Sequence, residues 1–178
     1  PKPVIKVKKI VVSGTSHVLS AGKKIQLKAT VTPANAKSKA VTWKSSNTKY
    51  ATVNSKGVVT TKKAGIGKKV VITAISKDGS KKYGTYKIKT VKGVVTKVKV
   101  TGSKTIKNGK SAKLKVAVSG TKESYKAVRW VSSNTKYATV NAKGVVTAKK
   151  AGKGKTVKIT AVAKDGSKKQ MTMKVKIK

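Results

Sequence analysis

The segment WKSSNTKYATVNSKGVVTTKKAG, residues 43–65, returns almost unchanged as WVSSNTKYATVNAKGVVTAKKAG, residues 130–152. The two copies are 87 residues apart, and the same offset holds through most of the chain. A unit of this length is too long for one repeat of a solenoid and has the size of a small domain. We therefore predict two tandem domains, residues 1–91 and residues 92–178.

Within each copy, apolar residues alternate with Lys or Thr, as in KLKVAV at 113–118, VKITAVA at 157–163 and MKVKIK at 173–178. This alternation places Val, Ile and Leu on the buried face of a strand and Lys on its solvent face. Short turn sequences such as NGK, NSKG and DGS separate the runs. About seven strands per copy predict an all-β fold of two antiparallel β-sandwiches. Trp43 and Trp130, on the third strand of each copy, are expected to be buried in the cores.

The chain has three acidic residues, and two of them, Asp78 and Asp165, occupy the same place in the two copies of KDGSKK. Asp-Gly between two strands is typical of a type I′ hairpin turn, because Asp tolerates positive φ and its carboxylate accepts hydrogen bonds from nearby backbone amides. Asn-Gly also suits such a turn. We interpret both aspartates as turn residues rather than as catalytic or metal-binding residues.

The net charge of +42 comes from 45 Lys and Arg against 3 Asp and Glu, and Arg129 is the only arginine. The charged fraction of 27% is ordinary for a soluble protein, so the sign of the charge is unusual and its amount is not. Solubility and the protection of strand edges account for part of the lysine content. So large an excess also creates a self-repelling field that weakens the compact state. A polyanionic partner would offset that repulsion.

The motif W-x-S-S-N-x-x-x-A-T-V-N-x-x-G-V-V-T, followed by A-G, an I-T-A strand and a D-G hairpin, covers both copies nearly end to end. It resembles the bacterial immunoglobulin-like domain of group 2, the repeated module of intimin- and invasin-type adhesins. The resemblance implies two tandem Ig-like β-sandwiches, secreted or displayed on the bacterial cell surface, that serve as a stalk or an adhesion module. Asn54 and Asn141 stand where members of the family commonly have Asp.

We predict that the protein is not an enzyme and has no cofactor, metal site or small-molecule substrate. His17 is the only histidine and has no counterpart in the second copy, and cysteine is absent. A hydrolase needs a nucleophile, a base and an orienting group within reach of one another, and calcium needs several oxygen ligands. No apolar run approaches the length of a membrane span and no signal peptide is recognisable. The start, PKPVIKV, reads as a piece excised from a longer chain.

The lysines are the remaining candidates for a function. We predict non-specific binding of polyanions through diffuse charge, with nucleic acid, heparan sulfate or heparin, teichoic acid and anionic cell-wall or mucin glycans as partners. A single arginine does not favour reading of base sequence. Stacking of single strands needs exposed aromatic rings, for which Tyr83, Tyr86 and Tyr125 are the candidates. The predicted polyanion-binding residues cluster in loops: Lys62, Lys63, Lys68, Lys69, Lys81, Lys82, Lys149, Lys150, Lys153, Lys155, Lys164, Lys168 and Lys169.

Two other interpretations remain open. In the first, the chain is an inert structural stalk whose lysines match an anionic cell wall. In the second, it is an adhesin for a specific protein receptor, which would require an exposed apolar or aromatic patch. An anionic membrane surface is a further conceivable partner. We expect the chain itself to be monomeric.

Overall fold

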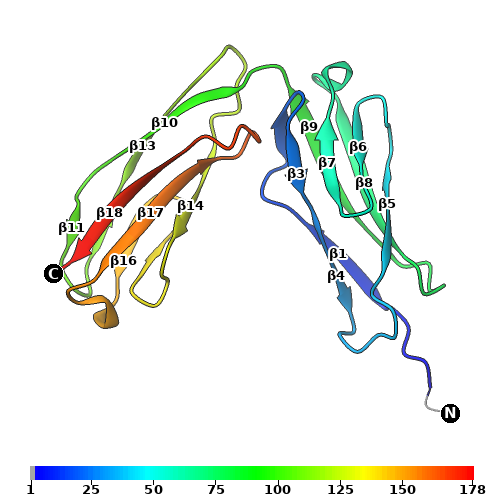
Figure 1. Cartoon of the computed structure of the whole chain (residues 1–178), viewed down its shortest axis with the longest axis horizontal. Helices are drawn as coiled ribbons and strands as arrows, with labels where there is room; N and C mark the ends of the chain where they lie inside the picture. The colour runs from blue at the N-terminus through cyan, green and yellow to red at the C-terminus, as the bar shows by residue number, and fades with distance from the viewer. Residues whose placement is uncertain (1–2) are drawn as a thin grey trace. The chain divides into compact units, whose positions relative to one another are not determined.

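The computed structural model describes residues 3–178 (Figure 1). It consists largely of strands, together with two short 3-10 turns, η1 (Lys63–Gly65) and η2 (Lys150–Gly152). It divides into two compact units: domain 1 ends at Gly93 and domain 2 begins at Val94. The sequence places this division two residues earlier. Gly93 stays with domain 1 because the Ser20 hydroxyl donates a 2.6 Å hydrogen bond to its carbonyl oxygen.

Domain 1 is a β-sandwich. One layer pairs β1 with β4 and, further along, β3 with β7 and β6, while the other layer has the order β2-β9-β8-β5. The pair β1/β2 and the pair β3/β4 are each one interrupted strand, so the nine segments between residues 3 and 93 form seven strands, as predicted. The segments are β1 (Lys9–Ser13), β2 (Val18–Ser20), β3 (Lys24–Gln26), β4 (Lys28–Thr32), β5 (Val41–Ser45), β6 (Ala51–Val53), β7 (Val58–Thr61), β8 (Lys69–Ser76) and β9 (Tyr83–Val91).

Domain 2 repeats this plan. It pairs β10 with β13 and β12 with β16 and β15, and its other layer has the order β11-β18-β17-β14. In Figure 1, β18, β17 and β14 lie side by side in this second layer. The segments are β10 (Val95–Thr101), β11 (Thr105–Ile106), β12 (Ser111–Lys113), β13 (Lys115–Gly120), β14 (Val128–Ser132), β15 (Ala138–Val140), β16 (Val145–Ala148), β17 (Thr156–Ala163) and β18 (Gln170–Ile177).

One pairing between strands in each domain departs from the antiparallel pattern predicted from the sequence. After β1 the chain crosses from one layer to the other and continues as β2, which pairs in parallel with β9. In domain 2, β11 pairs in parallel with β18 in the same way. The pairing is parallel because the first strand keeps its direction as it changes layers.

The core of each domain follows the alternation seen in the sequence. In β9 the buried positions are Gly84, Tyr86, Ile88 and Thr90, and the residues between them face solvent. The tryptophans deviate from the prediction, since Trp43 and Trp130 are only partly buried and pack against the margin of each core.

Each indole packs directly against a glycine at the margin of its core. A Cβ on Gly57, whose φ is +77°, would lie 2.8 Å from the ring of Trp43. A Cβ on Gly144, whose φ is +78°, would lie 2.9 Å from the ring of Trp130. A glycine is therefore needed at this motif position for two reasons: the turn requires a positive φ, and the indole leaves no room for a Cβ.

The loop that carries Asp78 is not the predicted two-residue turn. Ile75 pairs with Tyr83, so the loop spans the six residues from 77 to 82. Positive φ falls on Gly79 and Lys81, whereas Asp78 does not adopt it. The corresponding loop of domain 2 has positive φ at its own glycine and at Lys168. The type I′ prediction was therefore wrong, although the aspartates do shape the loop.

The carboxylate of each aspartate accepts two different kinds of backbone hydrogen bond. Oδ1 of Asp78 accepts the N–H of Ser80 at 3.0 Å, and Oδ2 accepts the N–H of Val7, 71 residues away, at 2.6 Å. An asparagine offers one oxygen and would turn its NH₂ group toward one of these donors. The long-range bond to the first strand, rather than the turn alone, explains why Asp stands here.

Asp165 has the same arrangement in domain 2. Its Oδ1 accepts the N–H of Ser167 at 2.9 Å and its Oδ2 accepts the N–H of Val95 at 2.7 Å. Asp165 is fully buried, whereas Asp78 is half-buried. Both carboxylates thus fasten the last hairpin of their domain to the chain at its first strand.

Candidate polyanion-binding surface

The predicted loop lysines lie in two separate clusters in each domain. In domain 1 the first cluster, Lys62, Lys63, Lys68 and Lys69, surrounds η1, and all four side chains are exposed. The N–H of Gly67 donates a 2.9 Å hydrogen bond to the carbonyl of Thr90, which holds this loop at the end of β9. In domain 2 the matching cluster surrounds η2 and is also exposed: Lys149, Lys150, Lys153 and Lys155.

The second cluster lies at the opposite end of β8, in the loop that also carries Asp78. In domain 1 it consists of Lys81 and Lys82, and in domain 2 of Lys164, Lys168 and Lys169. Lys164 is half-buried and the others are exposed. Strand β8 has 8 residues and, at about 3.3 Å per residue, separates the two clusters by about 25 Å. The loop lysines of one domain therefore do not form one patch.

A row of strand lysines lies between the two clusters. Lys87 and Lys89 of β9 point to the solvent face of the sheet, as do Lys158 of β17 and Lys174 and Lys176 of β18. These residues were left out of the predicted set, which drew on loops alone. The signal was present in the sequence, because each lies between two buried residues of an alternating strand.

The aromatic side chains are less accessible than predicted. Tyr86 is buried, with 6% of its surface exposed, and it stacks against the His17 ring with 4.1 Å between the centroids. Burial also raises the pKa of the Tyr86 hydroxyl. Tyr125 is half-buried, and Tyr83 is exposed as expected. A stacking surface for single-stranded nucleic acid would depend on Tyr83.

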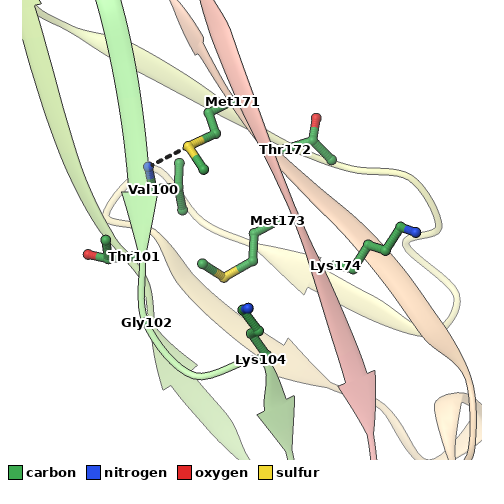
Figure 2. A pocket seen from close by; sticks show the side chains of 8 residues that line it. All are labelled: Val100, Thr101, Gly102, Lys104, Met171, Thr172, Met173 and Lys174. Carbon is green, nitrogen blue, oxygen red and sulfur yellow. Dashed lines mark hydrogen bonds between the residues drawn. The ribbon is translucent and has the colours of Figure 1, made fainter.

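Each domain has a hollow where its first strand changes layers, and the two hollows differ in lining. In domain 1 it measures about 660 Å³ and is lined by Gly14, His17, Tyr86 and their neighbours. In domain 2 it measures about 640 Å³ and is lined by Met171 and Met173. Figure 2 shows both methionines pointing from β18 toward β10, with the N–H of Val100 donating a 3.1 Å hydrogen bond to the sulfur of Met171.

The pKa of Asp78 is held well below its ordinary value of 3.8, because its carboxylate accepts hydrogen bonds involving the Ser80 side chain and the Val7 N–H. Between residues 3 and 178, no three of the His, Asp and Glu side chains come close enough to hold a metal ion. The same residues contain no helix that is long and apolar enough to span a membrane.

The family model of the bacterial Ig-like domain (group 2) matches this chain twice, at residues 6–86 and 94–173. An uncharacterized protein of Clostridium acetobutylicum is 33% identical over 142 residues, which are 79% of this chain and 14% of that relative. The chain therefore spans only a small part of its curated relative.

Three solved structures illustrate the structural likeness. An intimin mutant from EHEC O157:H7 is 25% identical over 54% of this chain and 52% of its own, with a TM-score of 0.38. Domains 5–6 of the S-layer protein SbsC are 20% identical over 96% and 98%, with a TM-score of 0.40. The Yersinia pseudotuberculosis adhesin InvE is 14% identical over 97% and 60%, with a TM-score of 0.37. With both of its domains matched by the family model, the chain belongs to the bacterial Ig-like domain (group 2) family.

Proposed function

We propose that this chain is a non-enzymatic, extracellular module of the bacterial cell surface that binds polyanions through diffuse lysine charge. The observation that carries the proposal is lysine exposure. Between residues 3 and 178 every lysine is exposed except Lys23 and Lys164, which are half-buried. At the same time, the carboxylates of Asp78 and Asp165 accept backbone N–H groups. The net charge of +42 is thus presented to solvent with little acidic surface to balance it.

The same surface favours ligands recognised by charge density rather than by sequence. One arginine provides little fork-shaped recognition of base edges, and Tyr86 is packed inside its domain instead of offering a stacking platform. The ligand classes that fit are nucleic acid bound without sequence preference, sulfated glycosaminoglycans, teichoic acid and anionic mucin glycans. The predicted loop lysines and the strand lysines between them would contact these chains jointly.

The test is binding to heparin and to mixed-sequence RNA and DNA, titrated across salt. We expect tight binding at about 150 mM salt, with log affinity falling by about 0.9 per log unit of salt for each phosphate contacted on duplex DNA. Affinity should not change with base sequence. Loss of all binding below physiological salt would overturn the proposal.

The second candidate is an inert stalk repeat of a bacterial surface adhesin. Family membership over both domains favours it, since it requires nothing from the lysines beyond solubility. The salt titration separates the two functions, because a stalk shows no binding to any of the polyanions at physiological salt.

A further inference from the structure

The strand lysines are paired differently in the two layers of each sandwich. On the solvent face of β8 and β9, Lys69 lies directly opposite Lys89, and Lys87 lies opposite Val71 in the adjacent row. Three lysines therefore occupy four neighbouring positions. In domain 2, Lys158 lies opposite Lys174 and Lys176 lies opposite Thr156, so the same four positions again hold three lysines.

The lysines of the other layer avoid this arrangement. In domain 1, Lys9 pairs with Thr32, Lys28 with Ser13 and Lys24 with Thr60. In domain 2, Lys97, Lys99 and Lys113 pair with Ser119, Ala117 and Val145. Among the paired strands of residues 3–178, lysine faces lysine only at Lys69/Lys89 and Lys158/Lys174. Like charges directly opposite each other are destabilising, so each pair is placed at a cost that a bound anion would remove.

In domain 1 the three lysines also line a hollow. Lys69, Lys87 and Lys89 surround a depression of about 290 Å³ together with His17, Val18 and Ile88. The imidazole of His17 is held in place from two sides: its Nδ1 is 2.8 Å from the carbonyl oxygen of Lys87, and its ring stacks on Tyr86. Because a carbonyl oxygen only accepts, Nδ1 carries the proton of this bond. The hollow thus has a fixed wall and three cations at its rim.

We propose that this hollow in domain 1 is a discrete binding site for one tetrahedral oxyanion, a sulfate or phosphate group, carried by an anionic glycan. The inference rests on the proposed function and assigns a specific site to it. An oxyanion between the Lys69 and Lys89 ammonium groups accepts from both and cancels their repulsion. The lysine stems and Val18 supply apolar walls for the carbon skeleton of a sugar or polyol, whereas the histidine ring is already stacked on Tyr86. This lining favours a glycan over a nucleobase.

The test compares two triple variants of the full chain that lose the same charge from the same domain. K69T/K87T/K89T removes the site, and K9T/K24T/K28T removes three exposed lysines of the other layer. Thr is suited to both because it favours strands and already occupies the position equivalent to Lys69 in domain 2, at Thr156. Circular dichroism and thermal melting of both variants establish that they fold.

Affinity is measured for a heparin oligosaccharide, a glycerol-phosphate oligomer and an RNA of equal charge. For the glycans, the affinity of the site variant should fall about tenfold further than that of the control variant. The slope of its log affinity against log salt should also decrease by about two units more than the slope of the control, at about one unit for each lysine contact. The sulfated and phosphorylated arms show which oxyanion the hollow prefers. Equal losses in both variants would overturn the site while leaving diffuse binding intact. A stronger effect on RNA than on either glycan would overturn the glycan assignment.

A second measurement is independent of the variants. Inorganic sulfate and phosphate are titrated into the wild-type chain while the side-chain NMR signals of the lysines are followed. Signals of Lys69, Lys87 and Lys89 should shift at lower anion concentration than those of Lys9, Lys24 and Lys28. Simultaneous shifts of all lysines would overturn the site. If the wild-type chain binds no polyanion at physiological salt, it is the proposed function that fails.

Discussion

The two domains share a motif and a strand order, but they differ where the first strand passes the last. In domain 1, β9 has Gly84 at this position, and a Cβ there would lie only 2.5 Å from the carbonyl oxygen of Ile10. In domain 2 the equivalent residue is Met171, whose sulfur accepts the N–H of Val100. At this position domain 1 therefore brings the two backbones into direct approach, whereas domain 2 links them through a side chain. The motif shared by the two domains determines their sheets, whereas the contact between the first and the last strand differs between them.

A second difference follows from the first. The residue two positions further along β9 is Tyr86, which stacks on His17, and its counterpart in β18 is Met173. His17 has no counterpart in domain 2, so its imidazole wall and the hollow it helps to line belong to domain 1. Two nearly identical motifs thus support different local surfaces, and each prediction below exchanges or removes one of the differences.

The largest effect is expected from giving domain 1 the residue that domain 2 has where the first strand passes the last. Gly84→Met should destabilise domain 1 by about 3 kcal/mol, the upper part of the range for overpacking, because the new Cβ meets backbone rather than a flexible side chain. Urea unfolding followed by Trp43 fluorescence in a Trp130→Phe background measures this. Thr85→Met, one residue away on the solvent face, serves as the control and should stay within about 0.5 kcal/mol. If Gly84→Met left the free energy of unfolding unchanged, the contact between β1 and β9 would tolerate the residue of domain 2.

The next largest effect is expected at the two aspartates. Asp165→Asn should cost domain 2 about 2 kcal/mol, because the buried amide would turn an NH₂ group toward the N–H of Val95 or Ser167. Asp78→Asn should cost domain 1 less, since Asp78 is half-buried and water can replace the lost acceptor. The pair is compared by denaturant unfolding, with Trp130 as the reporter for domain 2. Equal losses at the two positions would contradict the role assigned to burial.

A smaller effect is expected from exchanging the residues that set the lysine pairs. Lys158→Val copies Val71 of domain 1, removes the Lys158/Lys174 repulsion and should stabilise domain 2 by about 0.5 kcal/mol at low salt. Val71→Lys places a new lysine opposite Lys87 and should destabilise domain 1 by a similar amount. Both shifts should shrink at high salt, because exposed charges are screened. Changes in stability that do not depend on salt would indicate that they arise from packing rather than from charge.

Much of the fold follows from the sequence, because alternation and repetition are local signals. The offset between Trp43 and Trp130 identified two domains, and alternating strands gave the sheets. The same alternation places Tyr86 on the buried side with Ile88, so the sequence already contained the signal against an exposed Tyr86. The contact between Trp43 and Gly57 was less accessible to prediction, since Gly57 approaches the indole from the turn between β6 and β7.

The parts that escaped prediction depend on contacts between distant residues. The partner of Asp78 is the N–H of Val7, and nothing in KDGSKK indicates a bond to the first strand. The Lys69/Lys89 pair exists only in one register of β8 on β9, and a slip of one residue would abolish it. Composition supplied the excess of cations, but register decides which of them face each other.

The smallest expected effect is the dependence of domain 1 stability on pH in acid, which Asp78 should govern. Its folded pKa is depressed by hydrogen bonds, so the stability that it contributes is fully present above its unfolded value of about 3.8 and is lost as the pH falls below that value. Asp78 is the one acidic side chain in domain 1, so the acid limb should show the uptake of no more than one proton by a carboxylate.

Thermal unfolding of domain 1, followed by Trp43 fluorescence from pH 6 down to about pH 2, measures this limb. The control is Asp78→Ala, which should start from lower stability and lose the pH dependence, while it retains His17 and all the lysines of the domain. The two curves should approach each other in acid, because the unfolded chain takes up a proton at Asp78 there while the folded carboxylate, with its lowered pKa, resists protonation. Parallel curves would mean that the general repulsion of the lysines, rather than this carboxylate, governs how domain 1 responds to acid.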